Sequence, residues 1–374
     1  MSDKIKYYNP QKILSIDAYY YMIIGERSNG KTFAFLDIGL KSYVEKGHQF
    51  AYVRRWQDDF KGLRGKELMK SLICDGNGKN RVEIYTKGEW NDIVYESRAW
   101  YLARYDKEMG RMIKDNNPFA FAFAISSGEH DKSVSFPMVR MIMFDELLTR
   151  KSYLPNEFVE FMNIISTIVR LRNDVKVIML GNTISTSCPY FAEMGLKNIK
   201  KMKPNDIDVY TYGDTELKVA VEFADMPKKN KKSNVYFAFD NPKLSMIRGD
   251  GSIWEIGMYP HLPQKYTYED VIFVYFIIYD EETLQCEIID GGNGYFTYIH
   301  RKTTPIQNDD DIIFKTEYDI RYNVFRKINR PLTEMHRKIW SFFENDKVFY
   351  QDNEVGEIVR NYVNWCDTSE LEEI

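Results

Sequence analysis

Apolar residues in the first half of the chain fall into short runs separated by polar and glycine-containing segments. Four runs have the length of a strand and are rich in aromatic and aliphatic side chains: 19–24, 49–53, 138–146 and 175–180. Segments 32–43 and 156–172 instead repeat apolar side chains at helical spacing. Alternation of strands with helices predicts an α/β domain built on an open sheet.

The composition changes after residue 197, where lysines and polar residues replace the apolar runs. We interpret 206–265 as a linker segment between an N-terminal domain (1–205) and a C-terminal domain (266–374), which suits a chain of 374 residues. The C-terminal domain shows three strand-like runs and then two helical segments: 271–279, 284–289, 295–300, 330–343 and 353–365. This order predicts a smaller α/β domain with an RNase-H-like arrangement.

The segment after strand 19–24 carries the pattern GxxxxGKT: Gly25, Glu26, Arg27, Ser28, Asn29, Gly30, Lys31 and Thr32. It stands between a strand and a helix, which is the context that a phosphate-binding loop requires. Its glycines let backbone N–H groups face the phosphates of ATP. We expect Lys31 to reach the β- and γ-phosphates and Thr32 to bind Mg²⁺. The competing interpretation is a tight turn with a surface lysine.

Two carboxylates end strand 138–146. Ligands of open α/β sheets bind at the carboxyl ends of the strands, so Asp145 is expected beside the phosphate loop, where it would hold Mg²⁺ as in a Walker B strand. Glu146 would polarise the attacking water. An acidic pair after a strand also caps helices, and that alternative stays open.

Strand 175–180 ends in Gly181-Asn182. A polar side chain there would contact the γ-phosphate, so Asn182 is a candidate sensor, with a turn-forming Gly-Asn pair as the alternative. The gap between phosphate loop and Walker B strand holds strand 49–53. Together these segments predict a P-loop NTPase of the additional-strand (ASCE) type.

The helix predicted over 156–172 has one apolar face, and Arg170 lies roughly a third of a turn away from it. An outward arginine could complete the active site of a neighbouring subunit, because a guanidinium stabilises the charge on a transferring phosphoryl group. An ordinary surface arginine remains the alternative. Arg172 lies nearer the apolar face, where its positive charge could offset the partial negative charge of the helix C-terminus.

Charge and cysteine content narrow the function classes. A net charge of −4 is a weak signature for a protein that coats nucleic acid, although a local set of donors would serve a polymer that must slide. The four cysteines are scattered, so neither a zinc site nor a disulfide framework is indicated. The start of the chain shows no charged-then-apolar leader, and the most apolar run, 271–279, is about half of a membrane-spanning length, so neither secretion nor a membrane contact is expected.

The motifs together resemble the small DNA-packaging (encapsidation) ATPases of phi-29-type tailed phages. The resemblance covers about the first two hundred residues well and the rest loosely. It is carried, in the family's order, by Tyr8-Asn9-Pro10-Gln11-Lys12, the loop 25–32, Phe50-Ala51-Tyr52-Val53-Arg54-Arg55, Phe144-Asp145-Glu146, Pro155-Asn156-Glu157, Arg170-Leu171-Arg172 and Asn182.

Membership would imply a ring, expected to be a pentamer, that docks on the portal vertex of an empty prohead and pumps double-stranded DNA inward. Such a protein works in the host-cell cytoplasm and is absent from the mature virion. The resemblance also implies that Gln11 and the Asn9-Pro10 turn read the adenine and that Arg170 acts in trans. It leaves open whether a scaffold RNA lies between ring and portal.

DNA contacts are the least defined part of this hypothesis. The segment after Arg55 is less basic than expected, so the better candidates are basic residues further on, with ordinary solvated side chains as the alternative. These candidates are Lys61, Arg64, Lys66, Lys228, Lys229, Lys231 and Lys232.

Three other functions compete with a packaging motor. A helicase-like ring ATPase would act on single strands. A GTP-dependent switch lacks support, since no NKxD motif is present. A terminase-type nuclease needs carboxylates around the central strand of the C-terminal domain, whereas Asp280, Glu287 and Asp290 stand at strand ends or in turns. We therefore expect a C-terminal domain that binds DNA or prohead without cutting.

Overall fold

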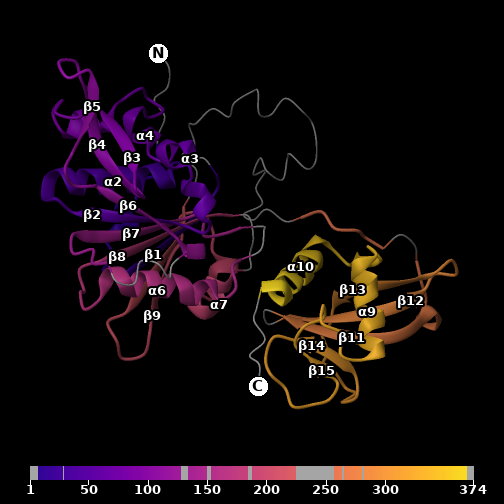
Figure 1. Cartoon of the computed structure of the whole chain (residues 1–374). Helices are drawn as coiled ribbons and strands as arrows, with labels where there is room; N and C mark the ends of the chain where they lie inside the picture. Colours follow the sequence, from indigo (N-terminus) through magenta and orange to yellow (C-terminus); the bar gives the residue numbers. More distant parts are fainter. Residues whose placement is uncertain are drawn as a thin grey trace. The chain divides into compact units, whose positions relative to one another are not determined.

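The computed structural model divides the chain into two compact units, Met1–Arg150 with Glu157–Trp254 and Lys151–Asn156 with Glu255–Ile374 (Figure 1). The structure describes these residues: 7–27, 29–127, 134–149, 153–183, 188–224, 257–262, 265–279 and 282–368. None of the helices within these ranges has the length and apolar character needed to span a bilayer.

The first unit is built on one sheet with the strand order β3-β4-β6-β2-β7-β8-β1-β10-β9, to which β5 is added beside β4. Strands β6, β2, β7, β8, β1 and β10 run parallel. The strands are β1 (Tyr20–Gly25), β2 (Gln49–Arg54), β3 (Asp92–Glu96), β4 (Ala99–Asp106), β5 (Arg111–Lys114), β6 (Ala120–Ala124), β7 (Val139–Asp145), β8 (Lys176–Asn182), β9 (Ile207–Thr211) and β10 (Lys218–Ala224).

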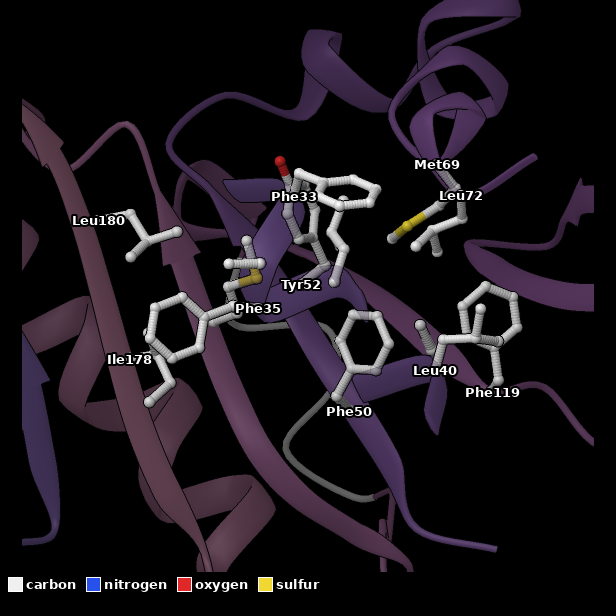
Figure 2. Close-up of a cluster of buried hydrophobic side chains, with 14 of the residues drawn as sticks. Phe33, Phe35, Leu40, Phe50, Tyr52, Met69, Leu72, Phe119, Ile178 and Leu180 are labelled. Atoms are coloured by element: carbon white, nitrogen blue, oxygen red, sulfur yellow. The ribbon is translucent and has the colours of Figure 1, made fainter. Parts of the chain in front are cut away.

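Helices cover both faces of this sheet. Helix α2 (Lys31–Lys46) buries Phe35 and Leu40 in a cluster with Phe50 and Ile178 from the strands, as Figure 2 shows. Helix α6 (Glu157–Val169) packs on the other face, where the Phe161 ring lies 4.9 Å from that of Phe144. Shorter helices are α1 (Gln11–Leu14), α3 (Leu63–Glu67), α4 (Lys70–Ile73), α5 (Arg81–Tyr85) and α7 (Pro189–Glu193), with 3-10 turns η1 (Gln57–Phe60) and η3 (Ile199–Lys201).

The expected linker over 206–265 is wrong in its first part. Strand β10 pairs in parallel with β1 along its whole length, from Tyr20 opposite Val219 to Gly25 opposite Ala224. Its six residues from Val219 to Ala224 are buried, so this segment belongs to the core of the sheet. Lys201 and Lys203, which belong to the lysine-rich stretch that suggested a boundary, are exposed and lie at the end of η3 and before β9, within the same unit. Residues 225–256 and 263–264 lie outside the described ranges.

The second unit has a six-stranded sheet with the order β15-β14-β11-β12-β13-β16. Strands β11, β12 and β13 are antiparallel neighbours, whereas β14 runs parallel to β11 and β16 parallel to β13. The predicted three strands and two helices are present. The elements are the 3-10 turn η4 (Tyr268–Asp270), β11 (Val271–Tyr279), β12 (Glu282–Asp290), β13 (Tyr295–Arg301), β14 (Ile312–Lys315), β15 (Val324–Phe325), α9 (Glu334–Glu344), β16 (Val348–Tyr350) and α10 (Asn353–Thr368).

Candidate nucleotide site

The phosphate loop connects the end of β1 to the start of α2, as its motif predicts. Gly30 has a φ of 86°, a left-handed conformation that favours glycine, and a Cβ there would stand 2.8 Å from the Tyr7 ring. At Gly25 a Cβ would stand 2.5 Å from the Ala224 carbonyl oxygen. Two of the motif's glycines are therefore required by backbone geometry. Glu26 is half-buried and Arg27 exposed, while Ser28 lies outside the described residues.

The Lys31 ammonium is buried inside this loop. It donates to the carbonyl oxygens of Gly25 (3.1 Å) and Glu26 (2.9 Å) and to Asn182 Oδ1 (3.3 Å). Burial lowers the pKa of Lys31 to about 7, and the charges of Asp145 and Glu26 oppose that shift in part. The lysine and the candidate sensor thus meet in one place, as the sequence predicted.

Asn29 shows that the loop suits an anion. Its side chain is 1% exposed, and Oδ1 accepts from the Lys31 backbone N–H at 3.2 Å. Its Nδ2 has no hydrogen-bond partner among the described residues. A buried donor without an acceptor is costly, so an acceptor such as a phosphate oxygen fits this position.

Thr32 and Asp145 bring the phosphate loop and the Walker B strand together. The Thr32 hydroxyl lies 3.2 Å from both Asp145 carboxylate oxygens, and the Tyr52 hydroxyl donates to Asp145 Oδ2 at 2.7 Å. Hydroxyl and carboxylate oxygens are the ligands that Mg²⁺ uses beside nucleotide phosphates. These two side chains could therefore hold the metal ion of a bound nucleotide.

Glu146 follows β7 in an unusual backbone conformation, with a φ of 61°. Its carboxylate is largely exposed and pairs with Arg54, whose Nη2 lies 2.9 Å from Glu146 Oε2. Arg54 Nη1 also lies 3.5 Å from Asp145 Oδ2, and Nε lies 3.3 Å from Asp59 Oδ2. Arg54 thus contacts both carboxylates. The sequence analysis named Arg54 as part of the segment 50–55 and assigned it no role.

The neighbouring Arg55 is buried and pairs with Glu157, the first residue of α6. Sequence analysis assigned no role to this pair. The only signal was a second arginine directly after an apolar strand, because the partner lies 102 residues away.

Arg170 lies at the surface just beyond α6. The helix ends at Val169, and Arg170 has a φ of 52°, so the predicted end at residue 172 is wrong. A residue in this left-handed conformation terminates a helix. Arg170 Nη2 donates to the Val134 carbonyl (3.1 Å) and to no phosphate-loop residue in the described part of the chain. Arg172 donates to the Ile168 carbonyl at 2.7 Å and so caps the helix C-terminus, one of the roles considered for it.

The N-terminal segment adjoins the phosphate loop through Tyr8, whose backbone N–H donates to the Asn29 carbonyl at 2.9 Å. The Tyr8 hydroxyl donates to the buried carboxylate of Glu222 on β10. Gln11 and Asn9 bond to each other, with Asn9 Nδ2 3.2 Å from Gln11 Oε1, and Gln11 is exposed. Of the expected adenine-reading residues, Asn9 and Gln11 are exposed and Pro10 is buried, and the three directly follow the residue that bonds to the phosphate loop.

Three of the seven candidate DNA contacts lie among the described residues. Lys61 pairs with Asp58 at 2.6 Å, Arg64 Nη1 lies 3.5 Å from the Asp58 carbonyl oxygen, and Lys66 is exposed. All three lie in or beside η1 and α3. The four lysines at 228, 229, 231 and 232 lie outside the described residues.

Carboxylates of the second unit are engaged in local bonds. Asp290 Oδ1 accepts from the Gly292 N–H at 2.9 Å, and Glu287 accepts from Tyr266 (2.5 Å) and Gln285 (2.7 Å). No group of three histidine, cysteine or carboxylate side chains suited to a metal ion occurs in the ranges that the structure describes. Asp280 is outside those ranges.

Comparison with known proteins agrees with this geometry. The family model of the podovirus DNA encapsidation protein (Gp16) matches residues 2–69 and 91–365. The chain belongs to this family. Its membership confirms the resemblance to packaging proteins of phi-29-type phages.

Members of the encapsidation family align with nearly the whole chain. The DNA packaging proteins of Bacillus phages PZA and phi29 are each 26% identical over 361 residues, which cover 94% of this chain and 95% of each relative. The Phi-28 gp11 DNA packaging motor is a structural neighbour with a TM-score of 0.53 and 20% identity, covering 98% of this chain and 99% of its own. The Phi-29 genome packaging motor assembly gives a TM-score of 0.50 at 24% identity, covering 95% and 96%. These two similarities establish a shared mixed α/β fold.

Proposed function

We propose that this encapsidation-family protein is the ATP-hydrolysing motor subunit that translocates double-stranded viral DNA into a preformed prohead. The observation that carries the proposal is the meeting of Thr32 with Asp145 and of Lys31 with Asn182, since two strands and a helix deliver these four groups to one edge of the sheet. β8 lies between β1 and β7, which supports an additional-strand P-loop NTPase. Family membership supports the choice of DNA packaging as the work performed.

The residues of the site divide the chemistry of ATP hydrolysis among them. Lys31 and the loop N–H groups would bind the β- and γ-phosphates, while Thr32 and Asp145 would hold Mg²⁺. The bound ion would neutralise charge that develops on the phosphates. Glu146 would take the proton of the attacking water, for which its carboxylate must first leave Arg54. Asn182 would register the γ-phosphate by donating from Nδ2 to a phosphate oxygen, while Lys31 leaves Asn182 Oδ1 for the phosphate.

The remaining assignments follow the family. We propose that Gln11 contacts the adenine, that Arg170 completes the site of the next subunit, and that the subunits form a ring, in our proposal a pentamer, on the portal vertex. The motor would act in the host-cell cytoplasm and leave before the virion matures. Lys61, Arg64 and Lys66 remain the proposed DNA contacts in the first unit.

The second unit is proposed as a DNA- or prohead-binding domain of RNase-H-like topology that does not cut. Its strand order places the three antiparallel strands β13, β12 and β11 beside two parallel strands, β14 and β15, which supports that topology. A terminase-type nuclease is the alternative. It predicts plasmid nicking in Mg²⁺ or Mn²⁺ that Asp280→Ala or Asp290→Ala abolishes, whereas we expect no nicking and largely intact packaging in both variants.

The experiment that tests the proposed function measures ATP turnover alone, with double-stranded DNA, and with DNA and cognate proheads. We expect the last condition to stimulate turnover most. Stronger stimulation by single-stranded DNA would instead favour a helicase-like ring. Binding of GTP with no binding of ATP would contradict the proposal in favour of a GTP-dependent protein.

A further inference from the structure

Arg55 and Glu157 form a buried ion pair directly behind the loop that follows β7. Arg55 Nε lies 2.7 Å from Glu157 Oε2, and Nη2 lies 2.9 Å from Oε1. The two side chains are 5% and 1% exposed. Such a pair is held by good geometry and additional hydrogen bonds, because desolvation of both charges opposes it. The Tyr190 hydroxyl supplies one further bond, to Glu157 Oε1 at 3.1 Å.

The same guanidinium also binds the backbone of Glu146 and Leu147, in the loop that follows β7. Arg55 Nη1 donates to the Glu146 carbonyl oxygen at 3.1 Å, and Nη2 donates to the Leu147 carbonyl oxygen at 2.8 Å. Because the guanidinium is planar and its donors are fixed relative to one another, it sets the direction of both carbonyl groups at once. A lysine has no such fork.

The backbone at Glu146 needs this support. Its φ of 61° lies in the left-handed region, which non-glycine residues occupy only when their surroundings hold them there. On the amide side, the Leu147 N–H donates to the Leu180 carbonyl at 2.8 Å and the Glu146 N–H to Asp145 Oδ1 at 3.0 Å. Arg55 provides the matching bonds on the carbonyl side.

We propose that Arg55 and Glu157 are positioning residues that hold Glu146 in the conformation required for water activation and that bond this loop to the first turn of α6. The inference rests on the proposed function, since it assigns the pair a part in the same reaction. Glu157 begins α6, and Arg170 directly follows the end of that helix. One subunit's catalytic glutamate and the arginine it offers to its neighbour are therefore fixed to the two ends of one helix.

Two variants and one control test this assignment in the full chain. Arg55→Lys keeps a buried cation but removes the fork. The double variant Arg55→Met with Glu157→Leu replaces the pair by apolar side chains, a change that often preserves stability. Arg140→Lys is the control, because Arg140 pairs with Asp174 at the other end of β7. Each protein is assayed for prohead-stimulated kcat and KM, for affinity toward a non-hydrolysable ATP analogue with Mg²⁺, for Tm, and for hydrogen exchange of the Leu147 amide without nucleotide.

If the assignment is correct, both Arg55 variants bind the analogue with near wild-type affinity while kcat falls about 10²-fold, the loss expected for misplacement by about 1 Å. Exchange of the Leu147 amide should accelerate about tenfold or more, because bonds from a charged donor stabilise the loop. The control should match the wild type in all four measurements.

Two results would overturn the assignment. One is a folded Arg55 variant with wild-type kcat and wild-type exchange. The other is a parallel loss of kcat, analogue affinity and Tm in both variants, which indicates a merely structural role. Should the wild type itself fail to hydrolyse ATP, the proposed function fails by itself. Exchange of the Leu147 amide then still tests whether Arg55 holds the backbone at Glu146 and Leu147, and unchanged exchange in the variants rejects that role.

Discussion

The Thr32 hydroxyl lies 3.2 Å from both carboxylate oxygens of Asp145, although 113 positions separate the two residues in sequence. The contact places the end of β7 against the start of α2. Asp145 is further fixed by the Tyr52 hydroxyl, so the carboxylate is oriented before any nucleotide binds. Preorganised ligands of this kind reduce the reorganisation that metal and nucleotide binding require.

Replacement of Lys31 and replacement of Glu146 should cause different defects. Lys31→Ala removes a proposed phosphate ligand and should weaken binding of ATP and suppress turnover. Glu146→Gln retains shape but cannot accept a proton, so it should bind ATP normally and stall with the nucleotide unhydrolysed. Equilibrium binding and single-turnover hydrolysis separate the two defects. Wild-type turnover by Glu146→Gln with proheads present would show that another group activates the water.

Arg170→Ala should leave folding and ATP binding unchanged and nearly abolish turnover. An exposed arginine contributes about 1 kcal/mol or less to stability, whereas an arginine finger contributes about 10³- to 10⁵-fold to the rate. Thermal unfolding, binding of a fluorescent ATP analogue and steady-state hydrolysis measure the three properties. Arg98→Ala, at another exposed arginine of the same unit, is a suitable control.

Mixing tests whether Arg170 acts in trans. Rings formed from Arg170→Ala and Lys31→Ala subunits contain interfaces at which an intact phosphate loop meets an intact arginine. Partial ATPase activity should return in proportion to such interfaces. Mixed rings that are shown to form and yet stay as inactive as each parent would assign Arg170 to its own subunit or to structure.

Proton uptake should accompany nucleotide binding at alkaline pH. Burial lowers the pKa of Lys31 to about 7, so the free protein holds this lysine largely neutral above that pH. Bound phosphates favour the ammonium and raise its pKa again, which requires a proton from solvent. Calorimetric titration at pH 8.5 in buffers of different ionisation enthalpy should detect up to about one proton per nucleotide, falling toward zero at pH 6. The Lys31→Met variant should show no such buffer dependence.

The same shift affects the nucleotide-free protein. The unfolded chain binds more protons at Lys31 than the folded chain does between pH 7 and the ordinary lysine pKa. The contribution of Lys31 to the free energy of unfolding therefore rises with pH across this interval.

Tyr8→Phe should destabilise the first unit, with the larger effect at high pH. The variant leaves the carboxylate of Glu222, 6% exposed, without its hydroxyl donor. Burial already raises the pKa of Glu222, and loss of the donor raises it further. When the pKa of a carboxyl is raised in the folded state, its contribution to the free energy of unfolding falls as pH rises through that pKa. Denaturant unfolding should therefore show a loss of about 1–3 kcal/mol at pH 8 and a smaller loss at pH 5. The control Tyr105→Phe, at an exposed position, should show neither the loss of stability nor its dependence on pH.

Local sequence patterns sufficed to predict that the groups proposed to bind phosphate and metal lie together. Lys31 and Thr32 stand in a contiguous motif, and Asp145, Glu146 and Asn182 each follow an apolar strand, so their convergence follows from the common edge of a parallel sheet. Asn182 was a candidate because it ends strand 175–180, whereas the pairing of β8 with β1 that brings it to Lys31 is not encoded in any short segment.

Long-range partners could not be predicted. β10 is a short, mostly apolar run interrupted by Glu222, and only its pairing with β1 shows that it belongs to the sheet. The bond between Arg55 and Glu157 likewise joins two elements whose register is set by tertiary packing. The end of α6 was misplaced because Arg170 and Leu171 continue the helical pattern, while the backbone at Arg170 is left-handed.

The pairing of Gly25 with Ala224 has a mechanical consequence. Ala224 is the last residue described before the chain continues toward the second unit, and its carbonyl oxygen would stand 2.5 Å from any Cβ at Gly25. The chain therefore continues toward the second unit from a residue that is paired with Gly25, the first residue of the phosphate loop. In the proposed ATPase, a displacement of that loop on phosphate release would act directly on Ala224, so force could enter the covalent chain at the point where chemical energy is released.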